Sequence, residues 1–158
     1  MKAKVMLAQI IMIVLLLIPF PALGQDNPVD IMKFVREKAL ADKKLLIAEE
    51  MRFTESEAKG FWLAYDSYQQ DMDKIIKRSI DLIQYYEKNY NSMTNEAAKK
   101  LLADTLAIES DRIEIRKKYV PIFGKSLSDK RLAKFYQLEN KIHAIVSDEV
   151  ARHIPLMK

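Results

Sequence analysis

Apolar residues recur at alternating spacings of three and four along much of the chain, the pattern of helices that bury one face. The clearest series runs from residue 61 to residue 86 and consists of Phe61, Tyr65, Tyr68, Met72, Ile75, Ser79, Leu82 and Tyr86. A second apolar stripe flanks it and consists of Trp62, Ile76, Ile83 and Tyr90. This wide face predicts a helix that packs against more than one neighbour, with the indole of Trp62 largely buried.

Three other segments carry a helical pattern. The first predicted helix runs from about residue 28 to residue 50. A later segment repeats the spacing with one polar exception, Arg112, and consists of Leu101, Thr105, Ile108, Ile115, Tyr119 and Ile122. The last segment has an apolar face made of Leu132, Phe135, Leu138, Ile142, Ile145 and Val146.

Start and stop signals divide these segments. Thr54 with Glu57 has the form of a capping box, and Thr94 and Ser128 are suitable N-caps for two later helices. Pro121 predicts that the third helix kinks or ends near residue 120, with Gly124 as a stop signal. We therefore predict an all-α fold of about four helices. The second and third form a long antiparallel hairpin, which the first and fourth cover.

The first 24 residues have the three zones of a signal peptide: a basic start, an apolar run over residues 5–18, and a segment of breaker and small residues. The apolar run is shorter than the roughly 20 residues that cross a membrane. Cleavage is expected after Gly24. The sequence thus predicts a periplasmic protein with a signal peptide at 1–24 and a single helical domain at 25–158.

Composition narrows the classes of partner. The chain has no cysteine, so disulfides cannot stabilise it. Of the 26 basic residues, Lys2 and Lys4 belong to the predicted signal peptide. The remaining 24 basic and 22 acidic residues give the mature chain a net charge of +2. A charge this small and the absence of a recognisable helix-turn-helix spacing give no reason to expect a nucleic-acid partner.

Three helix starts share a form, in which an apolar residue precedes a hydroxyl cap and polar residues. They are residues 53–57, 93–97 and 127–131, and the aromatic pairs 61–62 and 135–136 follow the first and third at the same offset. With the predicted leader and the lack of cysteine, these starts resemble the Leu-Thr-x-x-Gln motif of the periplasmic Spy and CpxP family. Glu57 and Arg131 stand where that motif has Gln. Most of the mature chain is also similar to a set of exported helical proteins of proteobacteria.

The inventory for catalysis is thin, and we expect neither an enzyme nor a cofactor. Two histidines occur, and each lies four residues after a glutamate, as Glu139 and His143 and as Glu149 and His153. This spacing puts both side chains on one helix face, so a weak metal site is the alternative hypothesis.

Three aromatic residues are weak candidates for contact with a partner: Trp62, Tyr85 and Tyr90. The resemblance implies a non-enzymatic envelope protein that binds protein clients or a sensor partner, as a chaperone or stress-response module. A metal-responsive protein and a structural or lipid-associated helical protein are the alternatives. A homodimer and membrane association stay open, although membrane association is not predicted.

Overall fold

The computed structural model of the protein describes residues 41–157, apart from the side chain of His153. Residues 41–51 are helical, and the elements that follow are α3 (Glu55–Asn89), the short 3-10 helix η1 (Tyr90–Ser92), α4 (Asn95–Phe123) and α5 (Asp129–His153). No strand occurs between residues 41 and 157, and the predicted all-α class is confirmed. The predicted signal peptide and the first part of the first predicted helix lie outside the described residues.

The chain divides into two compact units. The described part of the first unit consists of residues 41–52 and 133–155, and that of the second consists of residues 53–132 and 156–157. Helix α5 begins in the second unit and continues into the first. The single domain predicted over residues 25–158 stays a prediction.

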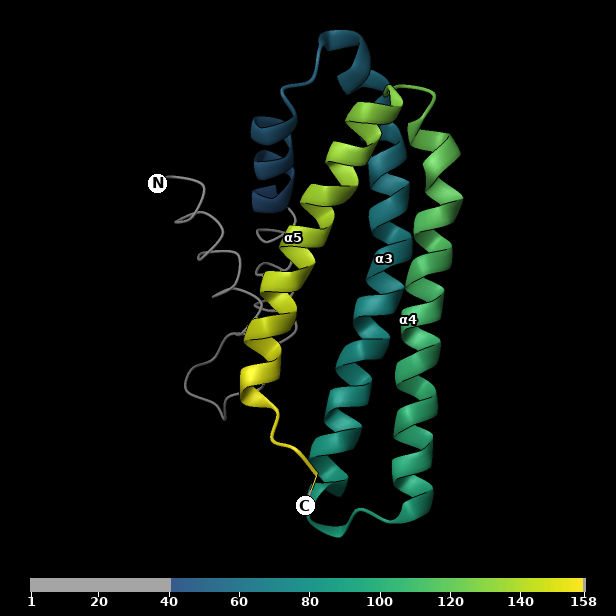
Figure 1. Ribbon diagram of the computed structural model, residues 1–158, viewed down its shortest axis with the longest axis vertical. Helices are drawn as coiled ribbons and strands as arrows, with labels where there is room; N and C mark the ends of the chain where they lie inside the picture. The colour runs from purple at the N-terminus through teal and green to yellow at the C-terminus, as the bar shows by residue number, and fades with distance from the viewer. Residues whose placement is uncertain (1–40, 158) are drawn as a thin grey trace, which may run out of the picture. The chain divides into compact units, whose positions relative to one another are not determined.

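The second unit is built on the predicted helical hairpin. Helices α3 and α4 run antiparallel, side by side, and η1 joins them (Figure 1). The capping box at the start of α3 is confirmed, because the Glu57 N–H donates to the Thr54 hydroxyl and the Glu57 carboxylate accepts from the Thr54 N–H. At the start of α4, the Thr94 hydroxyl accepts from the Ala97 N–H. Both helices therefore begin at the residues that the sequence indicated.

Aromatic rings form the core of the hairpin. The series predicted for α3 is confirmed at its main positions, since Phe61, Tyr65, Tyr68, Ile75 and Tyr86 are buried. Helix α4 contributes three buried residues, which are Ile108, Tyr119 and Phe123. The ring centroid of Phe123 lies 5.2 Å from that of Phe61, 5.6 Å from that of Tyr68 and 5.9 Å from that of Tyr119. These separations are typical of packed aromatic clusters.

The end of α4 agrees with one part of the prediction and not with another. The helix does not end near residue 120 but continues through Pro121 to Phe123, and Gly124, the predicted stop signal, is its C-cap. Proline removes one backbone hydrogen bond in the interior of a helix. The residues after Pro121 place Phe123 in the aromatic core. The free energy gained by burying its phenyl ring offsets the loss of that one hydrogen bond. The C-cap keeps its own bond, since the Gly124 N–H donates to the Val120 carbonyl at 3.0 Å.

Two predicted apolar-face positions are wrong. Thr105 is exposed, and its hydroxyl donates back to the Leu101 carbonyl at 2.8 Å. Ile76, in the stripe predicted to widen the apolar face of α3, is also exposed. Because Ile83 and Tyr90 are only half-buried, the buried face of α3 is narrower than predicted.

Gly60 lets α3 approach the segment that joins α4 to α5. A Cβ atom at this position would lie 2.1 Å from the Ser126 Oγ and 3.1 Å from the Ser126 Cβ. Any side chain at residue 60 therefore forces Ser126 to move. The close approach accounts for a glycine inside a helix, where it is otherwise unfavourable.

The first unit buries residues from both of its segments. Leu46, Ile47 and Met51 are buried in the helix at 41–51, and the backbone φ of 46° at Arg52 follows its end. In the part of α5 that belongs to this unit, the predicted apolar residues Phe135 and Ile142 are buried, whereas Leu138, Ile145 and Val146 are half-buried. Glu139 lies among them and is buried too, which the apolar pattern did not indicate. Leu132, in the part of α5 that belongs to the second unit, is also buried.

Candidate functional site

Glu139, one of the candidate metal ligands, forms an ion pair inside the first unit. Its two carboxylate oxygens lie 2.9 and 3.1 Å from the Lys43 Nζ, and both side chains are largely shielded from water. A buried carboxylate needs a partner of opposite charge, and Lys43 provides one. Glu139 therefore has a structural role in the first unit.

The other candidate metal ligands lie further along α5. His143 is exposed, and its Nδ1 lies 2.7 Å from the Ser147 hydroxyl, while Glu149 is half-buried. The side chain of His153 is outside the described part of the structure. Among the side chains that are described, no three of the types His, Cys, Asp and Glu come together in a group that could hold a metal ion.

Trp62, a candidate for partner contact that was also expected to be largely buried, is half-buried. Its ring lies edge-on to three others, with centroids 5.6 Å from Phe53, 5.0 Å from Phe61 and 5.4 Å from Tyr65. The rings of Phe61 and Tyr65 beside it are fully buried. Trp62 therefore covers the edge of the aromatic core and leaves part of its indole accessible.

Tyr85 and Tyr90 lie near the tip of the hairpin, and both are half-buried. Tyr90 packs edge-on against Tyr86, and the Lys100 ammonium lies 5.1 Å from the centre of the Tyr85 ring. Tyr85 lines a shallow hollow of about 340 Å³ between α3 and α4, together with Arg78, Asp81, Leu82, Lys100, Asp104 and Ile108. Lys100 pairs there with Asp104, and Arg78 pairs with Asp111. Both basic residues of the hollow are thus paired with carboxylates of α4.

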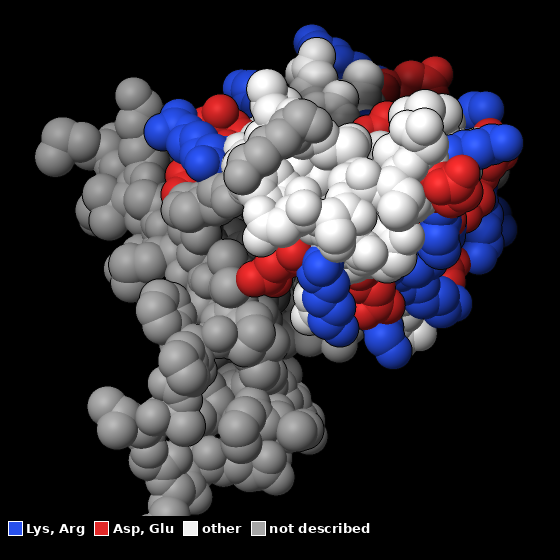
Figure 2. Space-filling model, turned by 90° about the horizontal axis from the view of Figure 1, so that it is seen from below, with Lys and Arg blue, Asp and Glu red and all other residues white. Residues whose placement is uncertain are grey.

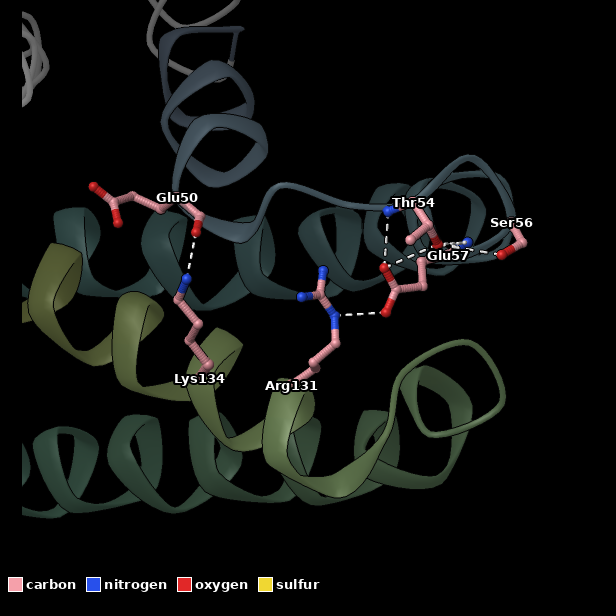
Figure 3. A network of polar contacts seen from close by, with 6 residues as sticks. All are labelled: Glu50, Thr54, Ser56, Glu57, Arg131 and Lys134. Carbon is pink, nitrogen blue, oxygen red and sulfur yellow. Dashed lines mark hydrogen bonds and ion pairs between the residues drawn. The ribbon is translucent and has the colours of Figure 1, made fainter.

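The first and third of the repeated helix starts meet in the structure. The Arg131 Nε lies 2.5 Å from a Glu57 carboxylate oxygen (Figure 3). The Arg131 guanidinium also lies 5.8 Å from the centre of the Phe53 ring. The hydrogen bond from the Thr54 N–H and the charge of Arg131 both lower the pKa of Glu57. Glu57 and Arg131, which both stand at the position of the final Gln in the motif that the sequence resembles, therefore form an ion pair with each other. Because Glu57 and Arg131 are more than 70 residues apart, the local sequence around each does not indicate that they meet.

In the first unit, a side chain of α5 forms a hydrogen bond with the end of the helix at 41–51. The Lys134 ammonium donates to the Glu50 backbone carbonyl at 2.5 Å (Figure 3). Carbonyls in the last turn of a helix lack partners within the helix. A lysine that donates to one of them stabilises the end of the helix at 41–51.

Asp71 is the main polar link between α3 and α4. Its carboxylate accepts from the Lys118 ammonium at 2.7 Å, from the Tyr119 hydroxyl at 3.1 Å and from the Lys74 ammonium at 2.9 Å. The hydrogen bond from Lys118, followed by that from Lys74, lowers the pKa of Asp71 from 3.8 to about 2. The same contact raises the pKa of Lys118. The ionised form of the Asp71 carboxylate therefore stabilises the packing of α3 against α4.

We predict that Asp71→Asn lowers the free energy of unfolding by about 1–2 kcal/mol at pH 7, a value discounted for the partial exposure of the pair. The pKa of Asp71 is depressed in the folded state. Its contribution is thus complete above its unfolded value of 3.8 and is lost as the pH falls toward 2. Urea denaturation of the parent and the variant at several pH values between 7 and 2 measures this. If the difference in free energy of unfolding between the parent and the variant is the same at pH 2 as at pH 7, the charge of Asp71 does not have this role.

The outer face of α4 carries four large apolar side chains in a row, which we call the α4 stripe. Leu102, Leu106, Ile113 and Val120 are 61%, 59%, 51% and 43% exposed. At about 100° per residue they fall within an arc of about 40°, and this arc is turned by about 120° from the buried face of α4. An exposed row of this kind is unusual on a monomeric soluble protein and is typical of an interaction surface. The stripe follows a helical spacing that is visible in the sequence, beside the series on the same helix that contains Ile108 and Tyr119.

The hairpin tip is a different surface. Residues 89–95 contain no charged side chain. The view from this end shows an uncharged area bordered by Lys, Arg, Asp and Glu (Figure 2). Tyr90 and Met93 are only half-buried there, whereas Asn91, Ser92, Thr94 and Asn95 are exposed. Because its exposed members are polar, the tip presents less apolar surface than the α4 stripe.

Comparisons with known protein families, curated proteins and solved structures find no match to this chain.

Proposed function

We propose that the protein is a non-enzymatic module of the cell envelope that binds segments of other proteins through the α4 stripe. The observation that carries the proposal is the exposure of Leu102, Leu106, Ile113 and Val120 on one face of a long, well-packed helix. Contact of apolar side chains with water is unfavourable, and burying them against a partner is favourable. A rigid helical hairpin holds them in a fixed row, which lowers the entropic cost of binding.

Two features of the sequence support this proposal. The predicted leader implies export to the periplasm, and the repeated helix starts resemble the motif of the Spy and CpxP family. No helix between residues 41 and 157 combines the length and apolar character needed to cross a membrane. Both the chaperone form and the sensor-binding form of the function need an exposed apolar surface, and the α4 stripe supplies one.

A direct test is the aggregation of an unfolded client protein. We expect the purified protein at several-fold molar excess to suppress light scattering by the client. The triple variant Leu102→Ser, Leu106→Ser and Ile113→Ser should lose most of this protection, because each substitution removes apolar contact area. The double variant Leu63→Ser and Ile76→Ser is the matched control, since it removes two exposed apolar residues of α3.

Circular dichroism should show both variants folded, because all five substituted side chains are exposed. If the parent leaves aggregation unchanged, the chaperone form of the proposal is wrong. If the triple variant protects the client as well as the parent does, the α4 stripe is not the binding surface.

A further inference from the structure

We propose that the α4 stripe binds one amphipathic helix of a partner protein, and that the partner's apolar seam is flanked by acidic residues. This inference rests on the proposed function, because it takes the stripe as the binding surface. It adds the conformation and the charge of the segment that binds there.

The spacing of the stripe matches a helical partner. Leu106, Ile113 and Val120 follow one another at intervals of seven residues, and Leu102 precedes Leu106 by four. An interval of seven keeps side chains on one side of two helices that wind slowly around each other, as in coiled coils. At about 1.5 Å per residue, the stripe is about 27 Å long and would accommodate a partner helix of about 18 residues.

The borders of the stripe are mainly basic. At about 100° per residue, four charged residues of α4 lie within about 60° of the stripe's centre. Three of them are basic, Lys99, Arg116 and Lys117, and one is acidic, Glu109. Lys117 contacts Glu114 at 2.8 Å, but both side chains are more than 60% exposed, and exposed pairs of this kind contribute little. A partner with acidic residues beside its apolar seam would therefore be electrostatically complementary.

The same observations disfavour two other occupants. A second copy of the chain would bring two borders with an excess of positive charge together, and like charges across an interface are unfavourable. A membrane surface favours a helix with a broad apolar face, whereas this stripe covers only about 40° of arc.

The experiment compares designed peptides of about 20 residues, each with leucines at the two seam positions of every heptad. One peptide has glutamate beside the seam, a second has lysine there, and a third has the acidic composition in scrambled order. Binding to the purified protein is measured by fluorescence anisotropy at low and high salt. We expect the acidic helix to bind at least about tenfold more tightly than the basic helix, and to weaken as salt rises.

Variants locate the site. Leu106→Ser with Ile113→Ser should weaken binding of the acidic helix at least about tenfold, and Leu63→Ser with Ile76→Ser should leave it unchanged. Equal affinity for the acidic and basic helices would overturn the charge assignment. Equal affinity for the scrambled peptide would overturn the helical assignment. Preferential binding to vesicles rich in anionic lipid, or stripe-dependent self-association in sedimentation, would replace the partner helix by a membrane or a second copy.

These outcomes are distinct from failure of the proposed function. If the α4 stripe variants lose client protection while the acidic and basic peptides bind equally, the stripe remains the binding surface and only the partner assignment fails. If the acidic helix binds through the stripe while client aggregation is unchanged, the chaperone form is wrong and the form that binds a specific partner stands.

Discussion

Phe123→Ala should lower the free energy of unfolding by about 3–5 kcal/mol, the usual range for a phenylalanine truncated in a core. Phe123 is fully buried and lies within 6 Å of three other rings, those of Phe61, Tyr68 and Tyr119. Its removal leaves a cavity that these rings cannot fill without leaving their preferred rotamers. Since domains are stable by only about 5–15 kcal/mol, the variant should be close to unfolding at room temperature.

Equilibrium denaturation in urea, followed by circular dichroism, measures this loss. Val120→Ala is the control on the same helix, because Val120 is 43% exposed and its truncation should cost less than about 0.5 kcal/mol. A Phe123→Ala variant that unfolds at the parent's denaturant midpoint would show that α4 ends before Phe123. Trp62→Ala should fall between the two, because its indole is half-buried.

The second large effect is expected at the ion pair between Lys43 and Glu139. Lys43→Met should cost about 3 kcal/mol, because it removes the cation beside a carboxylate that is largely shielded from water. The double variant Lys43→Met and Glu139→Met should recover most of that loss, since a buried ion pair can be replaced by apolar side chains of similar size at little cost. A double-mutant cycle measured by urea denaturation gives the coupling directly.

Lys117→Met provides the comparison with an exposed pair. Lys117 contacts Glu114 at a similar distance, 2.8 Å, but in water, so its replacement should change stability by less than about 0.5 kcal/mol. A Lys43→Met variant no less stable than the Lys117→Met variant would contradict the structural role of the pair. A double variant as unstable as Lys43→Met alone would show that the carboxylate is not what destabilises the single variant.

Local signals in the sequence were sufficient for the helices of the second unit. Thr54 and Thr94 cap α3 and α4 where predicted, because a hydroxyl that accepts from the first turn is a contact between residues close in sequence. The apolar series of α3 also predicted most of its buried face, since a period of 3.6 residues follows from helix geometry alone. The all-α class and the hairpin follow from these two kinds of signal.

Local signals in the sequence did not indicate which residues form an exposed binding surface. Residue type alone indicated Tyr85, Tyr90 and Trp62 as partner contacts, and each is half-buried against neighbours within the second unit. The sequence does not indicate the α4 stripe, because a helix with apolar residues on two faces gives no sign of which face is buried. Only the packing of α4 against α3 separates them.

By itself, the sequence determined what depends on neighbours along the chain: helical content, N-caps and the main apolar face of α3. Tertiary structure decided what depends on residues far apart. It carried α4 through Pro121, because burial of Phe123 outweighs one lost backbone hydrogen bond. It also paired Glu57 with Arg131 and Lys43 with Glu139, since a side chain's charge partner is set by which helices meet and not by local pattern.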